Sequence, residues 1–189
     1  MRGGDLNQRV IFQRADNSQN GFGELVESWV ELATVRSNVT ATTGRELYRD
    51  GDIEKQPVTV RCRYGSELGN LDAGDRVLVA RGFTSTTSAV TATGSTLKIA
   101  SAAEFPKAVT PDGAGANDYR VRVGSELMTV TSGHGTTEWT VTRGTDASTA
   151  TTHISGSAVA YMIPLDIESV TPSRESEDLA LEVQAVSYG

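Results

Sequence analysis

The sequence has few of the residues that cross-link a protein or fill its core. It has one cysteine, and aromatic residues make up 6% of its 189 positions. A single cysteine excludes a disulfide within the chain. The few aromatics, together with 19 glycines and 5 prolines, predict small hydrophobic cores, and small cores gain stability from oligomerisation. No stretch approaches the roughly 18 apolar residues of a membrane-spanning helix. The first residues lead into no signal-peptide core, so we expect a soluble chain made in the cytoplasm.

The charge is acidic, with a net value of -7 and a pI of about 4.9. This balance opposes wrapping of nucleic acid and binding to an anionic membrane. The segment 83–159 holds nearly equal numbers of basic and acidic residues. Most of the negative charge therefore belongs to the two ends of the chain.

Residues suited to catalysis or metal binding are scarce. His134 and His153 have no second His or Cys at zinc-ligand spacing. No Gly-x-Ser-x-Gly elbow and no phosphate loop occurs. Four aspartates lie in expected turns without a twelve-residue calcium loop: Asp50, Asp52, Asp72 and Asp75. We expect no enzymatic activity, no metal and no cofactor.

The stretch Asp75 to Gly82 organises the predicted fold. Its apolar, β-branched run predicts a strand that should return by a hairpin. The residues that follow do not return, and a partner strand comes only at 162–170. We therefore predict a mainly β protein: a small antiparallel β-barrel built from 1–82 and 160–189, with a second β-rich module, 83–159, inserted in a hairpin.

Further strands are expected in the barrel part. A strand at 9–14, a polar turn at 15–23 and a longer strand at 24–35 predict a hairpin, with a bulge near Trp29 and Trp29 as a core anchor. The clearest strand, 57–64, alternates buried-type residues with Thr59, Arg61 and Arg63. Cys62 should be a small buried hydrophobe. A last strand is expected at 179–186.

The segment 83–159 predicts its own strands. These are a short strand at 96–100 and a meander of 119–123, 126–131 and 138–142 with a tight Gly124-Ser125 turn. Its many threonines follow from β-propensity alone. The segment 44–56 predicts either a solvated loop or a projecting arm whose few apolar residues meet a partner.

Pieces at both ends resemble the head–tail joining, or head-closure, proteins of tailed bacteriophages. The residues that carry the resemblance are the opening Met1 to Val10, then Gln13-Arg14, Gly21-Phe22-Gly23, Trp29, Ala33-Thr34-Val35 and Gly44-Arg45-Glu46-Leu47, followed by the strands at 58–64, 76–79, 167–170 and 179–186. The inserted segment, where that family has a short turn, is similar to a Thr-rich β-module of other phage structural proteins. Its pieces are 122–130, 142–146 and 152–156.

The resemblance implies a virion structural protein of the phage neck. Such a chain forms a homo-oligomeric ring, dodecameric by that resemblance, between the portal or adaptor protein above and the tail or tail-terminator protein below. DNA passes through the channel without sequence-specific binding, and the ring helps to retain it. The alternative is a surface-exposed β-protein that binds a glycan or a host protein through the inserted module.

A contact between subunits is the site hypothesis. In a head-to-tail ring each copy offers two different surfaces, so a basic face could meet an acidic one. The resemblance adds apolar contact from the arm. The residues expected at this interface are Arg45, Glu46, Leu47, Tyr48, Arg61, Arg63, Glu175, Glu177 and Asp178.

Overall fold

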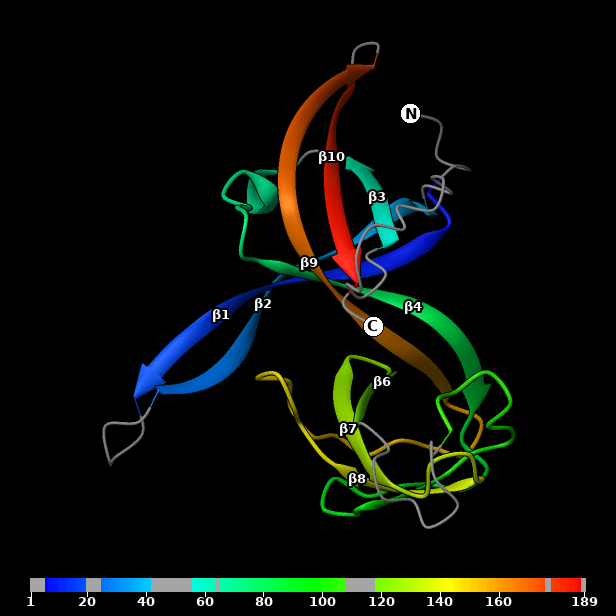
Figure 1. Ribbon diagram of the computed structural model, residues 1–189. Helices are drawn as coiled ribbons and strands as arrows, with labels where there is room; N and C mark the ends of the chain where they lie inside the picture. Colours follow the sequence, from blue (N-terminus) through cyan, green and yellow to red (C-terminus); the bar gives the residue numbers. More distant parts are fainter. Residues whose placement is uncertain are drawn as a thin grey trace, which may run out of the picture. The chain divides into compact units, whose positions relative to one another are not determined.

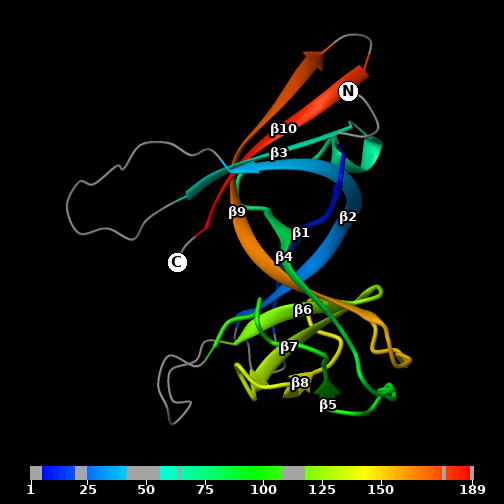
Figure 2. The ribbon, with the colours of Figure 1, turned by 90° about the vertical axis from the view of Figure 1, so that its right-hand side faces the viewer.

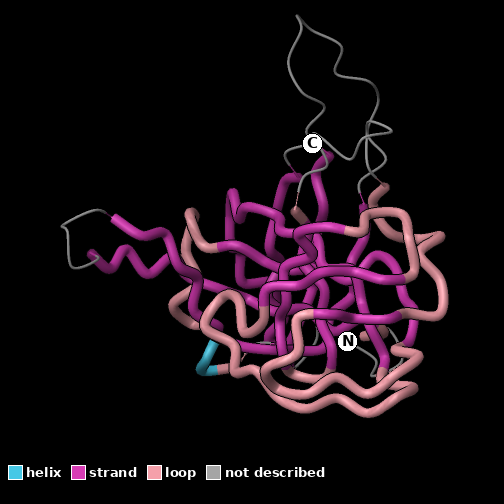
Figure 3. Tube along the Cα trace, turned by 90° about the horizontal axis from the view of Figure 1, so that it is seen from below, coloured by secondary structure: helices cyan, strands magenta, loops and turns pink. Residues whose placement is uncertain are grey.

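The computed structural model describes residues 6–19, 25–41, 56–63, 65–107, 118–175 and 178–187. Within these ranges the protein is mainly β and contains no α-helix. Figure 3 shows strands throughout, with one short helical turn, η2. The mainly β class predicted from the sequence is confirmed.

Ten strands pair antiparallel in the order β10-β3-β2-β1-β4-β9-β6-β7-β8-β5, and β10 also pairs with β9 (Figure 1). Each predicted strand has a counterpart among them. Their bounds are β1 Gln8–Gln19, β2 Leu25–Ala41, β3 Gln56–Arg63, η2 Ser66–Leu68, β4 Arg76–Ser85, β5 Thr96–Lys98, β6 Tyr119–Val123, β7 Glu126–Ser132, β8 Glu138–Thr142, β9 Ala158–Glu175 and β10 Asp178–Ser187.

The chain divides into two compact units. The first unit combines Met1–Val79 with Pro164–Gly189, and the second unit is Ala80–Ile163. The segment 83–159 falls within the second unit. Both β4 and β9 contribute residues to each unit, and they are neighbours in the strand order, as predicted for these two stretches. Beside β4, the Ile167 N–H donates to the Asp75 carbonyl at 3.0 Å.

The predicted hairpin of β1 and β2 forms, but its strands are longer than expected. Residues 15–19, assigned to a polar turn from the sequence, continue β1 and pair with 25–29. A two-stranded ribbon tolerates polar residues on both faces, so their polarity did not end the strand. The bulge lies at Leu32, because Phe12 pairs with Ala33 and Gln13 with Glu31. The prediction of a bulge near Trp29 was therefore three residues off.

β3 alternates as its sequence predicts. Val58, Val60 and Cys62 are buried, while Arg61 and Arg63 are exposed. Burial raises the pKa of the Cys62 thiol to about 11, so Cys62 is an unreactive core residue. β10 lies along β3 and continues the ladder (Figure 2).

Trp29 is not the core anchor expected from its size. Its ring is half-buried, and the Arg76 guanidinium lies over it, 3.9 Å from the ring centroid. Arg76 also donates through Nε to Gln13 Oε1 at 2.8 Å. The role of Trp29 is thus to cover a buried arginine by a cation–π contact.

The second unit contains the predicted meander β6-β7-β8. The turn between β6 and β7 places Gly124 at a φ of +63°, which suits glycine. Elsewhere in this unit the backbone of Thr86 pairs with Gly156 and Ser157. The Thr87 N–H donates to the Lys98 carbonyl, and the Ala100 N–H donates to the Ser85 carbonyl. Trp139 is fully buried at the centre, in contact with Phe105 and Tyr119.

The two tryptophans should differ in their contribution to stability. Trp139→Ala should lower the free energy of unfolding by about 3–5 kcal/mol, because it empties a packed core. Trp29→Ala should lower it by only about 1–2 kcal/mol, since it removes a half-buried ring and one cation–π contact. Urea unfolding followed by far-UV circular dichroism measures both. Equal losses would contradict the peripheral position of Trp29.

Candidate interaction surface

The outward face of β3 carries the two basic residues predicted for a contact between copies. Arg61 and Arg63 are both exposed on the face opposite the core. Their placement follows from strand alternation, since Val60 and Cys62 point the other way. The predicted orientation of this pair is therefore confirmed; its partner is a separate question.

Register brings two further arginines onto the same face. Arg9 of β1 is the direct partner of Arg36 of β2. β2 pairs with β3 from Ser37 and Cys62 onward, and Arg36 and Arg63 are the residues that adjoin this first pair on the two strands. We call Arg9, Arg36 and Arg63 the arginine row. All three are exposed, and none makes an ion pair with a side chain that the structure describes.

Sequence reasoning missed Arg9 and Arg36. Strand alternation alone places each on the outward face of its own strand. Only the register between β1, β2 and β3 shows that they lie side by side with Arg63. No local pattern in the sequence contains that register.

Arg61 differs from the row. Its register partners are Glu182 on β10 and Asn38 on β2. An acidic residue directly opposite an arginine in an antiparallel pair is a favourable arrangement.

The acidic turn predicted as the complement of these arginines joins β9 to β10. Glu175 is the last residue of β9 and pairs with Asp178, the first residue of β10. Two positions further, Ala180 is the partner of Arg63. The acidic turn and the basic face therefore lie on neighbouring strands of one chain. The remaining predicted site residues, Arg45, Glu46, Leu47, Tyr48 and Glu177, lie outside the described residues.

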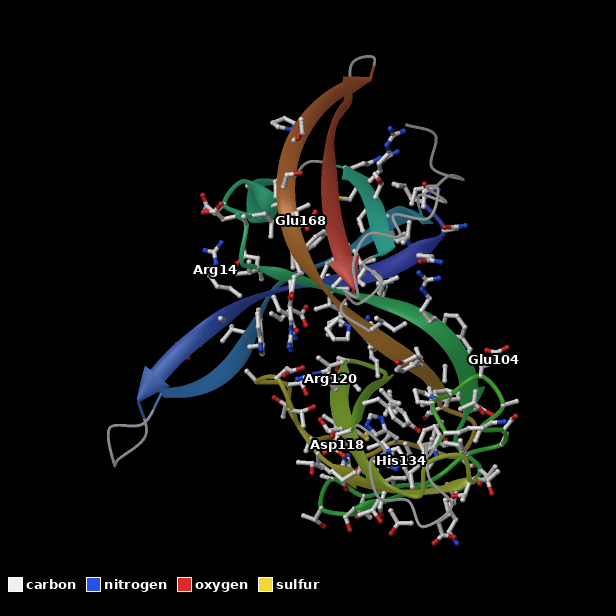
Figure 4. The ribbon with its side chains drawn as sticks, in the orientation of Figure 1. Arg14, Glu104, Asp118, Arg120, His134 and Glu168 are labelled. Carbon is white, nitrogen blue, oxygen red and sulfur yellow. The ribbon has the colours of Figure 1, made fainter. Side chains whose placement is uncertain are left out.

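One ion pair fastens the start of β4 to β1. Arg14 donates to Asp75 through Nε at 2.8 Å and Nη2 at 2.7 Å (Figure 4 labels Arg14). Asp75 also accepts the backbone N–H of Asp72 at 2.9 Å. The hydrogen bond and charge of Asp75 raise the pKa of Arg14. Asp75, expected as a solvated turn residue, is instead a buried anchor of that turn.

The second unit holds a buried charged cluster that sequence reasoning also missed. Glu126 is fully buried and accepts a bidentate pair from Arg143, Nε to Oε1 at 2.6 Å and Nη2 to Oε2 at 2.8 Å. His153 Nε2 lies 2.7 Å from Glu126 Oε2. The backbone N–H groups of Gly144 and Thr151 also donate to this carboxylate.

This cluster holds three loops together. Arg143 additionally donates to the carbonyls of Thr91, Gly94 and Thr151. Burial of Glu126 opposes its ionisation, but hydrogen bonds from Arg143, Thr151 and His153 and the charge of Arg143 outweigh it. They lower the pKa of Glu126 to about 2. Fully paired in this way, the cluster fixes loops rather than supplying a free acid or base.

His134 belongs to an aromatic cluster of the second unit. Its ring packs edge-on against Tyr119 with centroids 5.4 Å apart, and Tyr119 packs against Trp139 and Tyr161. Figure 4 shows His134 among the side chains of the second unit. Burial, followed by the charge of Tyr161, raises the pKa of Tyr119.

Across the described ranges, no group of three or more His, Cys, Asp or Glu side chains is placed to hold a metal ion. None of the helical segments described is long and apolar enough to cross a bilayer.

Comparison with known proteins gives one match. The family model described as "Phage head completion protein" matches residues 1–104, which is more than half of the chain. The match includes β1 to β5 and stops before 160–189, where the resemblance was also expected. No curated protein and no solved structure matches the chain.

The buried cluster predicts a pH dependence. The pKa of Glu126 is lower in the folded chain, about 2, than the ordinary value of 4.5, so unfolding takes up a proton at low pH. Its stabilisation is complete above pH 4.5 and should disappear as pH falls towards 2. Glu126→Gln should abolish this component and lower stability at pH 7 by about 3–5 kcal/mol, because Arg143 stays buried without its partner.

Urea unfolding across this pH range, followed by Trp139 fluorescence in a Trp29→Phe background, measures the effect. Glu138→Gln is the matched control, because Glu138 pairs with Lys98 at the exposed surface. A wild-type stability that is flat between pH 5 and 2 would contradict the assignment.

Proposed function

The chain belongs to the phage head completion protein family, and from this premise we propose that it forms a ring in the phage neck, between the DNA-filled head and the tail. The family implies a structural component of the virion that acts where head and tail meet. The further steps proposed here are oligomerisation into a ring, docking to a portal or adaptor protein and to a tail protein, and retention of the packaged DNA. The work is mechanical, not catalytic.

The family match over residues 1–104 is the observation that carries this proposal. The fold supports it, because a small unit rich in antiparallel strands offers rigid faces and long hairpins for contacts between subunits. Its acidic charge is compatible with DNA passage, since repulsion prevents the channel from gripping the polyanion tightly.

We propose that the first unit closes into the predicted barrel. Six of its strands pair in the order β10-β3-β2-β1-β4-β9, and β10 pairs with β9 as well. Such a circuit would leave no open sheet edge among these strands, which suits a protein that must avoid uncontrolled edge pairing. The segment 83–159 is then a guest in the β4–β9 hairpin.

Deleting 83–159 tests this arrangement. If the segment is a guest, joining Gly82 to Ala160 through a short glycine-containing turn should leave a cooperatively folding first unit. Urea unfolding monitored by Trp29 fluorescence and far-UV circular dichroism measures this. A deletion variant that unfolds gradually, without a cooperative transition, would show that 83–159 is part of one shared core.

The arm is proposed as the main contact between copies in the ring. In one chain the acidic turn and Arg63 lie on neighbouring strands. Copies that exchanged both contacts between these neighbouring surfaces would form a two-fold dimer. A ring needs two different surfaces. We propose that the arm residues Arg45, Glu46, Leu47 and Tyr48, which lie outside the described residues, supply the second surface through their apolar side chains.

Assembly measurements test the ring. Leu47→Ser combined with Tyr48→Ser should leave the chain folded but shift its mass from oligomer to monomer in light scattering, because the apolar contact of the arm is lost. Phe83→Ser, at a side chain that is 64% exposed in the second unit, is the control and should assemble normally. An arm variant that assembles like the wild type would remove the arm as the main contact. A wild-type chain that stays monomeric would favour the glycan- or host-binding alternative.

A further inference from the structure

The arginine row is a concentrated positive charge on an acidic protein. Arg9, Arg36 and Arg63 stand on three adjacent strands, β1, β2 and β3. Neighbouring strands lie about 4.8 Å apart, so the row is roughly 10 Å long. Like charges directly opposite each other destabilise an antiparallel pair. The fold therefore retains an unfavourable arrangement that an anion would relieve.

Among the side chains that the structure describes, none pairs with the row as a counter-charge. The next residues of β2 on the same face are Thr34 and Asn38, and the β10 partner of Arg63 is Ala180. These side chains are uncharged. Glu182 stands opposite Arg61, one step further along the ladder. The acidic residue nearest to the row along this ladder is thus Glu182, which stands directly opposite Arg61 and not opposite a member of the row.

We infer that the arginine row contacts the phosphate backbone of DNA. This inference rests on the proposed function, in which DNA passes through a ring of these chains. Three exposed guanidinium groups attract the line of single negative charges along a DNA strand. Guanidinium groups bind phosphate oxygens by paired hydrogen bonds, and the row contains arginine only.

A second copy of the chain is the other acidic candidate, and the geometry disfavours it. Its predicted acidic turn lies on strands next to the row of its own chain, and copies that exchanged both contacts would form a closed dimer and not the proposed ring. DNA has no such constraint. Contact with phosphates alone carries no sequence information, which agrees with DNA of any sequence moving past the row.

Each copy of the chain should bind DNA weakly. The remaining charge of the chain repels a polyanion, so each copy offers three local contacts in a repulsive environment. Three phosphate contacts predict a slope of about −2.7 for the logarithm of the binding constant against the logarithm of salt concentration. Repetition of the row around a ring would retain DNA while each single contact stays easily broken.

The experiment uses the full chain and two fluorescently labelled DNA duplexes of unrelated sequence. Binding is measured by fluorescence anisotropy over a range of salt concentrations. The test variant is Arg9→Gln, Arg36→Gln and Arg63→Gln together. The matched control is Arg81→Gln, Lys98→Gln and Lys107→Gln, three exposed positions in the second unit. Both variants lower the net charge by three, and thermal unfolding checks that both are folded.

The wild type and the control should bind both duplexes alike, with a slope of about −2.7, and the row variant should lose at least tenfold in affinity at low salt. Each single Arg→Gln change should reduce the slope by about 0.9. Equal losses in the row variant and the control, or no binding by the wild type at low salt, would overturn the inference.

Light scattering on the same samples separates this inference from the ring. A row variant that loses self-association while its DNA binding equals that of the wild type would make the row a protein contact and overturn the inference. A wild-type chain that binds DNA through the row but stays monomeric would support the inference and contradict the ring. If the wild type forms a ring and the row variant binds DNA as tightly as the wild type, the proposed ring is supported and the inference is overturned.

Discussion

The register of the ladder β1-β2-β3-β10 is the constraint on which the first unit depends. Because side chains alternate along a strand, a slip of one residue would turn Val10, Val60 and Cys62 outward and bury arginines in their place. Moving charged side chains into a core is far more costly than any single turn contact. The same register that assembles the core therefore also aligns the arginine row, so the row is inseparable from the fold.

The positions of the strands could be predicted from the sequence because they are encoded locally. The alternation of 57–64, the meander after Tyr119 and the late partner of β4 are all visible in apolar spacing and turn residues. Register between strands distant in sequence is not encoded this way. For that reason Arg61 and Arg63 were found as an outward pair, while their neighbours Arg9 and Arg36 were not. For Trp29 the prediction from the residue itself was wrong. Its size suggested a core position, but the hairpin in which it lies leaves its ring half-buried.

Buried polar groups explain the remaining differences between the structure and the predictions from the sequence. The sequence shows Glu126, Arg143 and His153 as isolated residues, each with an ordinary solvated interpretation. Their loops converge only after β7, β8 and the Val90–His153 bridge have formed. Burial of the carboxylate is then tolerated because five donors surround it. The low aromatic content of the sequence predicted small cores. It did not predict that a buried charged cluster would anchor the loops of the second unit.

The two units thus use charge differently. In the second unit, opposite charges are buried and fully paired, which fixes loops and leaves little electrostatic field outside. In the first unit, like charges are exposed on a sheet face that the core holds rigid, so their field extends into solvent. A net charge of -7 describes neither arrangement. An acidic chain can repel DNA as a whole and still present a narrow line of arginines to it, because screening limits each exposed charge to about 10 Å at ordinary salt. Local placement by strand register, more than net charge, therefore decides what this surface can bind.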